Sequence, residues 1–286
     1  MTSTRLGAPR VRRFNIGEIA IRVALAALVV FALFPILWFV YTSFRNESDI
    51  ISRSASFIPN GVTMDNYIRT WSQTDFPRLM FNSLVVVLWT VAISLTLGSL
   101  AAYSMSRSRF RGRGSVLSIF LSIRVIPAVL LLIPIYILMM QANLLDTRIA
   151  LVLTYTTFTL PAAIWFMKGF FDSLPVDLEN AARVDGCTRL GALFRIVLPL
   201  VRPGLAATAI LIAIESWNDI LFALLLTSST ESRTWPVGMK MLVGEFQLPW
   251  GQLAAATVLS LIPVVIAFAF AGRAMIEGLT AGGLKD

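Results

Sequence analysis

Six long apolar runs constrain the fold of this chain more than any other feature. Each is at least as long as the roughly 20 residues that a helix needs to cross the hydrocarbon core of a bilayer. The runs occupy residues 19–44, 82–105, 115–140, 148–171, 203–227 and 251–275. Charged residues make up only 14% of the chain, whereas about a quarter is usual in a soluble domain. The sequence therefore predicts an all-α membrane protein with six transmembrane helices embedded in the lipid bilayer.

Lysine and arginine are unevenly divided between the two sides of these runs. Of the 24 basic residues, 16 fall on the side that holds both termini, seven fall on the other side, and Arg124 lies inside a run. Cytoplasmic loops carry the excess of positive charge, so both termini are predicted to be cytoplasmic. The expected organisation is a tail over 1–18, a membrane domain over 19–275 and a tail over 276–286. This topology accounts for the net charge of +8 without nucleic acid as a partner.

The cytoplasmic connection 172–202 is predicted to form two short helices. In the first, Glu179 and Arg183 stand four residues apart in the order that favours an ion pair. Gly186 is a natural end for that helix. The second helix shows apolar residues on one face and is expected to end at Pro199.

The first of these helices carries a recognisable motif. The chain reads Leu-Glu-Asn-Ala-Ala-Arg-Val-Asp-Gly-Cys, and Arg-Ile-Val-Leu-Pro-Leu follows at a fixed spacing. This pattern resembles the EAA loop of the permease subunits of binding-protein-dependent ABC importers. The resemblance implies a coupling helix that docks into a groove on an ATPase subunit. It assigns this contact to Glu179, Asn180, Ala181, Ala182, Asp185, Gly186, Ile196, Leu198 and Pro199.

The motif departs from the family at one position. Asn180 stands where the family usually has a glutamate that pairs with a basic residue of the ATPase. The amide can form hydrogen bonds but brings no charge. The neighbouring Glu179 is expected to point about 100° away around the helix.

Three further segments resemble the MalG-type branch of the family, which handles di- and oligosaccharides, polyols and related solutes. They are Pro127-x6-Pro134 with Leu145-Asp146-Thr147, Trp217-Asn218-Asp219, and the closing stretch from Gly278 to Lys285. The resemblance implies a multi-pass subunit of the inner (cytoplasmic) membrane that imports sugars or sugar-like solutes. It also implies that the C-terminal tail, with Gly282, Gly283 and Lys285, reaches towards the ATPases.

The resemblance implies several partners. They are a second, MalF-like permease, two copies of an ABC ATPase, and an extracellular or periplasmic solute-binding protein. No Gly-x4-Gly-Lys-Ser/Thr loop occurs in the chain, so ATP and Mg are expected on the ATPases and no cofactor on this subunit. A metal site is not expected either, because the chain has no histidine and only one cysteine.

Polar residues inside the runs are the candidates for a translocation path. Arg124 and Glu215 lie deep in the third and fifth runs, where charge requires a partner or a wet cavity. Asp219 follows Glu215 by four residues, so the two carboxylates are expected to share one face, with Asn218 beside them. Tyr155, in a hydroxyl-rich part of the fourth run, completes the set. Arg124 and Glu215 could instead form an ion pair that holds two helices in register, and both interpretations stay open.

Two other classes of membrane protein fit less well. An intramembrane serine protease would need a histidine, and an intramembrane aspartyl protease would need acids on two facing helices. A secondary carrier would usually show inverted repeats and would not need a docking loop. An ABC permease for a non-sugar solute remains the nearest alternative.

Overall fold

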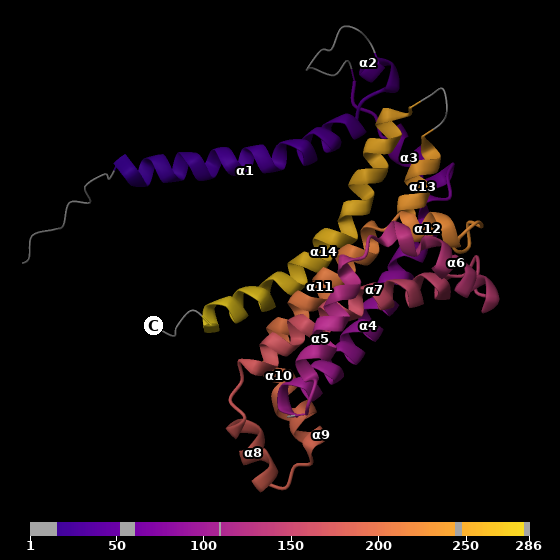
Figure 1. Cartoon of the computed structure of the whole chain (residues 1–286). Coiled ribbons are helices and arrows are strands. Elements are labelled where there is room, and N and C mark those ends of the chain that lie inside the picture. The colour runs from indigo at the N-terminus through magenta and orange to yellow at the C-terminus, as the bar shows by residue number, and fades with distance from the viewer. Residues whose placement is uncertain (1–15, 52–60, 109, 244–247, 283–286) are drawn as a thin grey trace, which may run out of the picture.

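The computed structural model describes residues 16–51, 61–108, 110–243 and 248–282, and every regular element in these ranges is a helix (Figure 1). The longer helices are α1 (Ile16–Ser43), α4 (Phe76–Arg107), α7 (Arg148–Asp172), α11 (Arg202–Asn218) and α14 (Trp250–Gly282). Shorter elements connect them: α2 (Glu47–Ile51), α3 (Asp65–Ser72), α5 (Arg113–Ser122), η1 (Ile123–Val125), η2 (Ala128–Leu131), α6 (Leu132–Gln141), α8 (Asp177–Val184), α9 (Arg189–Ala192), η3 (Leu193–Val197), α10 (Leu198–Leu200), α12 (Leu221–Leu226) and α13 (Trp235–Leu242).

Four helices are long and apolar enough to cross a membrane unaided, namely α1, α4, α7 and α14. Two further spans are possible only if each of two bent helix pairs counts as one, which brings the total to six. The all-α prediction is therefore confirmed for the described residues. The prediction of six spans holds only with two of them bent.

Pro127 breaks the third predicted span. The segments Arg113–Val125 and Ala128–Gln141 meet at 94°. Ile126 is extended (φ −72°, ψ 121°), as expected for the residue before a proline. Prolines often bend membrane helices, but of the two prolines in this span only Pro127 lies at the bend. Pro134 lies in the first turn of α6, where its missing N–H removes no helical hydrogen bond.

The fifth predicted span, 203–227, is wrong as a continuous helix. Helix α11 ends at Asn218, and Asp219 is extended with ψ at 129°. A carboxylate oxygen of Asp219 accepts the backbone N–H groups of Phe222 and Ala223 at 3.1 and 3.2 Å. This side chain therefore caps the new helix α12 instead of continuing α11. The second bent pair lies at the other end of α11, where Arg189–Leu200 meets Arg202–Asn218 at 78°.

The expected helix end at Pro199 is also wrong, because the chain stays helical through Leu200. A five-residue π turn, η3, comes directly before α10, in which Pro199 is the second residue. A proline ring clashes with the carbonyl of the preceding regular turn. The wider π turn accommodates the ring, and the direction changes only at Val201.

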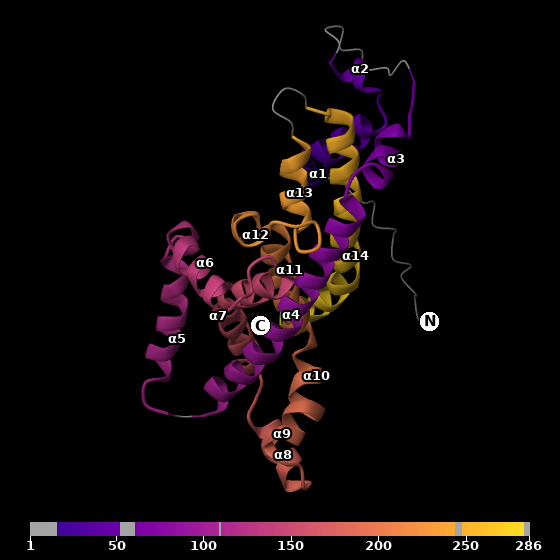
Figure 2. The same ribbon diagram turned by 90° about the vertical axis from the view of Figure 1, so that its right-hand side faces the viewer.

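Helices α4 and α7 form the centre of the molecule and lie side by side in both ribbon views (Figures 1 and 2). Their backbones approach closely where small residues meet. A Cβ on Gly98 would stand 2.8 Å from the Cβ of Ala163. One turn away, the hydroxyls of Ser94 and Thr159 are 2.8 Å apart. This is the small-residue packing that membrane helices use in place of a hydrophobic driving force.

Helix α1 stands apart from this centre. It packs on α14 and then projects sideways from the bundle (Figure 1). Its large apolar side chains, such as Leu28, Phe31 and Phe34, are exposed. An apolar helix of this length with an uncovered surface is suited to lipid or to another subunit.

Candidate functional site

The loop that was predicted to couple to an ATPase lies at one end of the molecule. Helices α8 and α9 extend below the bundle in both ribbon views (Figures 1 and 2). Gly186 follows the last turn of α8 and has φ at +89°, a backbone conformation that residues with a Cβ rarely adopt. The N–H of Cys187 returns to the carbonyl of Ala182 at 3.0 Å. The hydroxyl of Thr188 then caps α9 by accepting the N–H of Gly191 at 3.0 Å. Gly186 is thus confirmed as the end of the first helix.

The predicted contact residues divide between two sides of α8. Asn180, Ala181, Asp185 and Gly186 are exposed, whereas Glu179 and Ala182 are buried. Beyond the turn, the remaining three are half-buried: Ile196, Leu198 and Pro199.

The sequence reasoning missed one exposed residue on the outer side of α8. Val184 is 88% exposed and follows Asn180 and Ala181 by four and three residues, so it shares their side of the helix. The signal was available, because an apolar residue on the outer side of a solvated helix is unexpected unless something covers it.

Glu179 does not pair with Arg183 as expected. Its carboxylate accepts hydrogen bonds from Nε of Arg107 at 2.5 Å and from the hydroxyl of Tyr103 at 2.8 Å. Both partners belong to the C-terminal end of α4. The arginine and glutamate side chains are only 12% and 8% exposed. The i,i+4 preference on an exposed helix is worth about 0.5 kcal/mol at most, so a buried, charge-assisted contact with a second helix outweighs it.

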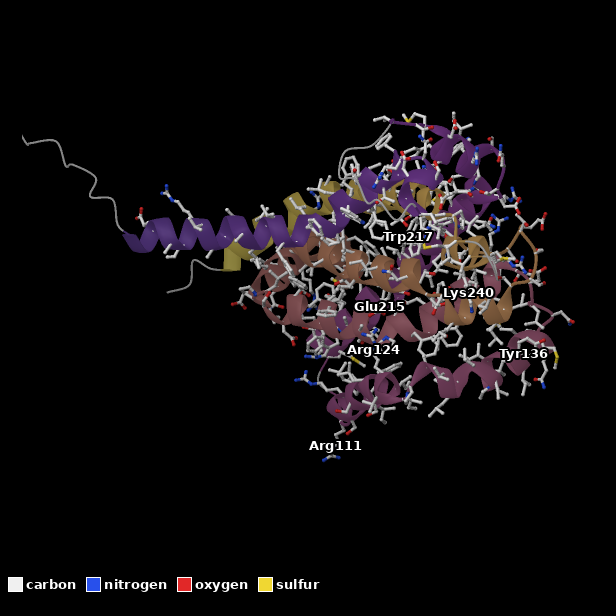
Figure 3. The ribbon with its side chains drawn as sticks, turned by 90° about the horizontal axis from the view of Figure 1, so that it is seen from above. Arg111, Arg124, Tyr136, Glu215, Trp217 and Lys240 are labelled. Atoms are coloured by element: carbon white, nitrogen blue, oxygen red, sulfur yellow. The ribbon has the colours of Figure 1, made fainter. Side chains whose placement is uncertain are left out.

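Arg124 and Glu215 form an ion pair, as expected if they hold two helices in register. Nη2 of Arg124 donates to both carboxylate oxygens of Glu215, at 2.5 and 2.6 Å. The two side chains come from η1 and α11 and lie next to one another in Figure 3. They are 35% and 42% exposed. The pair therefore joins two elements and is also open to whatever covers this face.

Asp219 is separated from Glu215, contrary to expectation. The helix that would have placed both carboxylates on one face ends at Asn218. Asp219 turns towards α7, where it accepts the hydroxyl of Tyr155 at 2.9 Å. The amide of Asn218 donates to the carbonyl of Ile214 on its own helix at 2.8 Å. The predicted path residues thus form two separate groups, Arg124 with Glu215 and Tyr155 with Asp219.

A third polar site lies near the turn between α6 and α7. One oxygen of Asp146 accepts the N–H groups of Ser228 and Ser229 at 2.8 and 2.9 Å, and also the hydroxyl of Ser232. Burial disfavours the charged form, but the hydrogen bonds outweigh it and hold the pKa of Asp146 well below its usual range. Asp146 therefore ties this turn to the segment after α12.

The predicted tail residues lie at the edge of the described chain. Gly282 is the last residue of α14, which continues past the expected end of the span at 275. Gly283 and Lys285 lie outside the described residues. Among the residues that the structure describes, no cluster of His, Cys, Asp and Glu could hold a metal ion.

Comparison with known proteins identifies the family. A family model described as "Binding-protein-dependent transport system inner membrane component" matches residues 94–278. The sulfoquinovosyl glycerol transport system permease protein SmoH of Agrobacterium fabrum is 37% identical over 283 residues, which cover 99% of both chains. The trehalose transport system permease protein SugB of Mycobacterium tuberculosis is 36% identical over 260 residues, covering 90% of this chain and 94% of SugB.

A solved structure shares the fold. One chain in the crystal structure of a bacterial ABC transporter involved in the import of the acidic polysaccharide alginate superposes with a TM-score of 0.77. The two chains are 24% identical, and the match covers 93% of this chain and 99% of the other. The relatives are permease components and not enzymes, which assigns this chain the same kind of role. The chain belongs to the family of inner-membrane components of binding-protein-dependent transport systems.

Proposed function

We propose that this chain is a permease subunit of an ABC importer that takes up sugars or sugar-like solutes, such as di- or oligosaccharides and polyols. The observation that carries the proposal is the nearly full-length similarity to permeases named for the transport of trehalose and of sulfoquinovosyl glycerol. The importer would include a second permease, two ATPase subunits that bind ATP and Mg, and an external solute-binding protein. Both termini and the 172–202 loop would face the cytoplasm.

In this proposal, the outer side of α8 is the surface that contacts the ATPase. Asn180, Ala181, Val184 and Asp185 are exposed there, so they can reach a partner. Ala182 and Glu179 point inwards and would act indirectly, by holding α8 in place. Gly282 and the tail residues Gly283 and Lys285 would reach towards the ATPases from the end of α14.

The translocation path would run along the face that carries Arg124 and Glu215. Charged side chains at membrane depth and more than one-third exposed need a wet cavity or a protein partner. The 94° break at Pro127 follows Arg124 closely in the sequence, and broken helices commonly line transport pathways. Asn218 is exposed on the same helix as Glu215, whereas Tyr155 and Asp219 would support the wall of the path.

Uptake into proteoliposomes tests the proposal. The complex is purified through a tag on this chain, reconstituted with its solute-binding protein, and supplied with labelled disaccharides, polyols and, as controls, amino acids and dipeptides. ATP-dependent uptake of a sugar or polyol is expected. ATP-dependent uptake of an amino acid or dipeptide, but of no sugar or polyol, would contradict the proposed solute class. Purification of the chain without any ATPase would contradict the importer assignment.

A further inference from the structure

We propose that the Arg107–Glu179 ion pair is the mechanical link between α8 and the transmembrane bundle, so that Arg107 and Glu179 are positioning residues for coupled transport. This inference rests on the proposed function, because it concerns how movement of the ATPase reaches the membrane helices. It adds a specific route, from α8 to α4, and a residue on α4 that the loop motif does not contain.

The first support is the isolation of α8 from the spans. The extensive contacts of α8 are with α9 and η3, and neither α4 nor α7 is among them. Glu179 and Ala182 are the two buried residues of α8. Glu179 reaches α4 through its side chain, which accepts hydrogen bonds from Tyr103 and Arg107.

The second support is the geometry at the end of α4. Besides Glu179, the guanidinium of Arg107 donates to the backbone carbonyl of Leu174 at 3.2 Å and to the hydroxyl of Ser106 at 3.1 Å. The hydroxyl of Ser106 donates to Asp172, the last residue of α7, at 2.6 Å. One arginine thus joins the ends of α4 and α7 to the start of α8. A planar guanidinium holds several acceptors in fixed directions, which a lysine cannot do.

The third support is the stiffness of α4. It is a single helix of 32 residues, with Arg107 as its last residue and a buried face against α7. A force on Glu179 would therefore be transmitted to the whole helix and, through Ser94 and Gly98, to α7. The pair is poorly accessible to water, so solvent ions would screen it little.

The test compares four variants in the purified complex: Arg107→Gln, Glu179→Gln, the exchanged pair Arg107→Glu with Glu179→Arg, and Arg22→Gln. The last is a control, because Arg22 forms an exposed ion pair with Glu18 within α1, outside the group of residues that joins α4, α7 and α8. Three quantities are measured: the ATPase that co-purifies, the solute taken up per ATP hydrolysed, and the hydrogen exchange of the α8 amides.

We expect Arg107→Gln and Glu179→Gln to keep the co-purified ATPase near the wild-type amount and to speed exchange in α8. Uptake per ATP should fall on the order of tenfold, which is typical of a lost coupling between two sites. The exchanged pair should regain part of both quantities, and Arg22→Gln should match the wild type. Rescue by exchange would not be expected from a residue that only fills space.

Normal uptake per ATP in Arg107→Gln, with faster exchange in α8, would overturn the inference. Loss of the ATPase from both single variants would also overturn it, because the pair would then be needed for assembly. Neither outcome contradicts the proposed function, which fails only if the wild-type complex lacks an ATPase or ATP-dependent uptake.

Discussion

At the scale of single residues, the Arg124–Glu215 pair has two candidate roles, as a link between two helical elements and as part of the translocation path. The contact of one guanidinium nitrogen of Arg124 with both carboxylate oxygens of Glu215 indicates a pair that joins η1 to α11. Its partial exposure leaves it open to solute or to a second permease. Sequence reasoning found both residues because charge is rare in apolar runs. It could not decide that they meet, since 91 residues separate them.

The two roles of this pair can be separated by substitution. Arg124→Met leaves Glu215 without its partner, and an unpaired charge is worse than none. We expect a lower yield of assembled complex with Arg124→Met, and partial recovery when Glu215→Gln is added. Uptake should stay impaired in the double variant if the pair also lines the path. Co-elution with the partner permease measures assembly, and labelled solute measures uptake.

Arg111→Met is the matched control for that experiment. Arg111 lies at the edge of the molecule, away from Arg124 and Glu215 (Figure 3), so its loss should change neither measurement. Full assembly and full uptake in Arg124→Met would contradict both roles of the pair.

Val184 should lie in the contact between α8 and the ATPase, because it is 88% exposed on the outer side of α8. An arginine there would bring an unpaired charge into the contact, which typically costs several kcal/mol, so we expect Val184→Arg to reduce the co-purified ATPase about tenfold or more. Ala182→Arg should also reduce it, but by disrupting the loop, and should therefore speed hydrogen exchange in α9 as well. Asn180→Ala, which removes no charge, should be tolerated.

At the scale of elements, the contact between α4 and α7 depends on the absence of one methyl group. Alanine is favoured over glycine in a helix by about 1 kcal/mol, but the added Cβ would stand 2.8 Å from that of Ala163. Overpacking typically costs about 1–3 kcal/mol, so we expect Gly98→Ala to be neutral to destabilising and Gly98→Leu to be strongly destabilising. Unfolding in detergent measures the effect.

The compensating change separates crowding from other causes. Ala163→Gly restores the missing space, so the double variant Gly98→Ala with Ala163→Gly should recover stability relative to Gly98→Ala. No recovery would show that the two helices do not meet at this point.

Which elements could be predicted depends on how local their causes are. The break at Pro127 was predictable because a proline restricts its own backbone and that of Ile126. The end of α8 was predictable for a similar reason, since Gly186 tolerates a positive φ. The break at Asp219 was missed because this residue could either continue α11 or cap a new helix. Its cap on α12 and its hydrogen bond with Tyr155 favour the break. The contact of Glu179 with Arg107 depends on tertiary structure and has no local signal.

At the scale of the whole molecule, orientation can be tested with the single cysteine. Cys187 is half-buried in the turn after α8, on the side predicted to be cytoplasmic. We expect a membrane-impermeant maleimide to label it in inside-out vesicles and not in intact cells. Denatured samples provide the control for reactivity, and labelling of intact cells would reverse the topology. Partial protection in vesicles that retain the ATPase would agree with docking nearby.

The stability of the complex should depend on pH through Asp146, which lies at the end of the molecule opposite α8. Its lowered pKa means that the folded state favours the ionised carboxylate. The resulting stability is present above the unfolded pKa of about 3.9 and is lost as the pH falls towards the folded value. Asp146→Asn should therefore lower the Tm of the complex at pH 7, and lower it by a smaller amount near pH 3, where the carboxyl of the unfolded chain is largely protonated. An equal difference at both pH values would contradict the role of the charge.

The 94° turn at Pro127 also restricts which sides of α5 and α6 can contact lipid. Pro127 has no N–H, and Ile126 is extended, so peptide groups at this turn cannot complete a helical ladder. In hydrocarbon an unmet peptide carbonyl costs several kcal/mol, so the turn cannot face lipid chains. We therefore expect this turn to face protein or water in the assembled complex, and the opposite sides of α5 and α6 to face the bilayer.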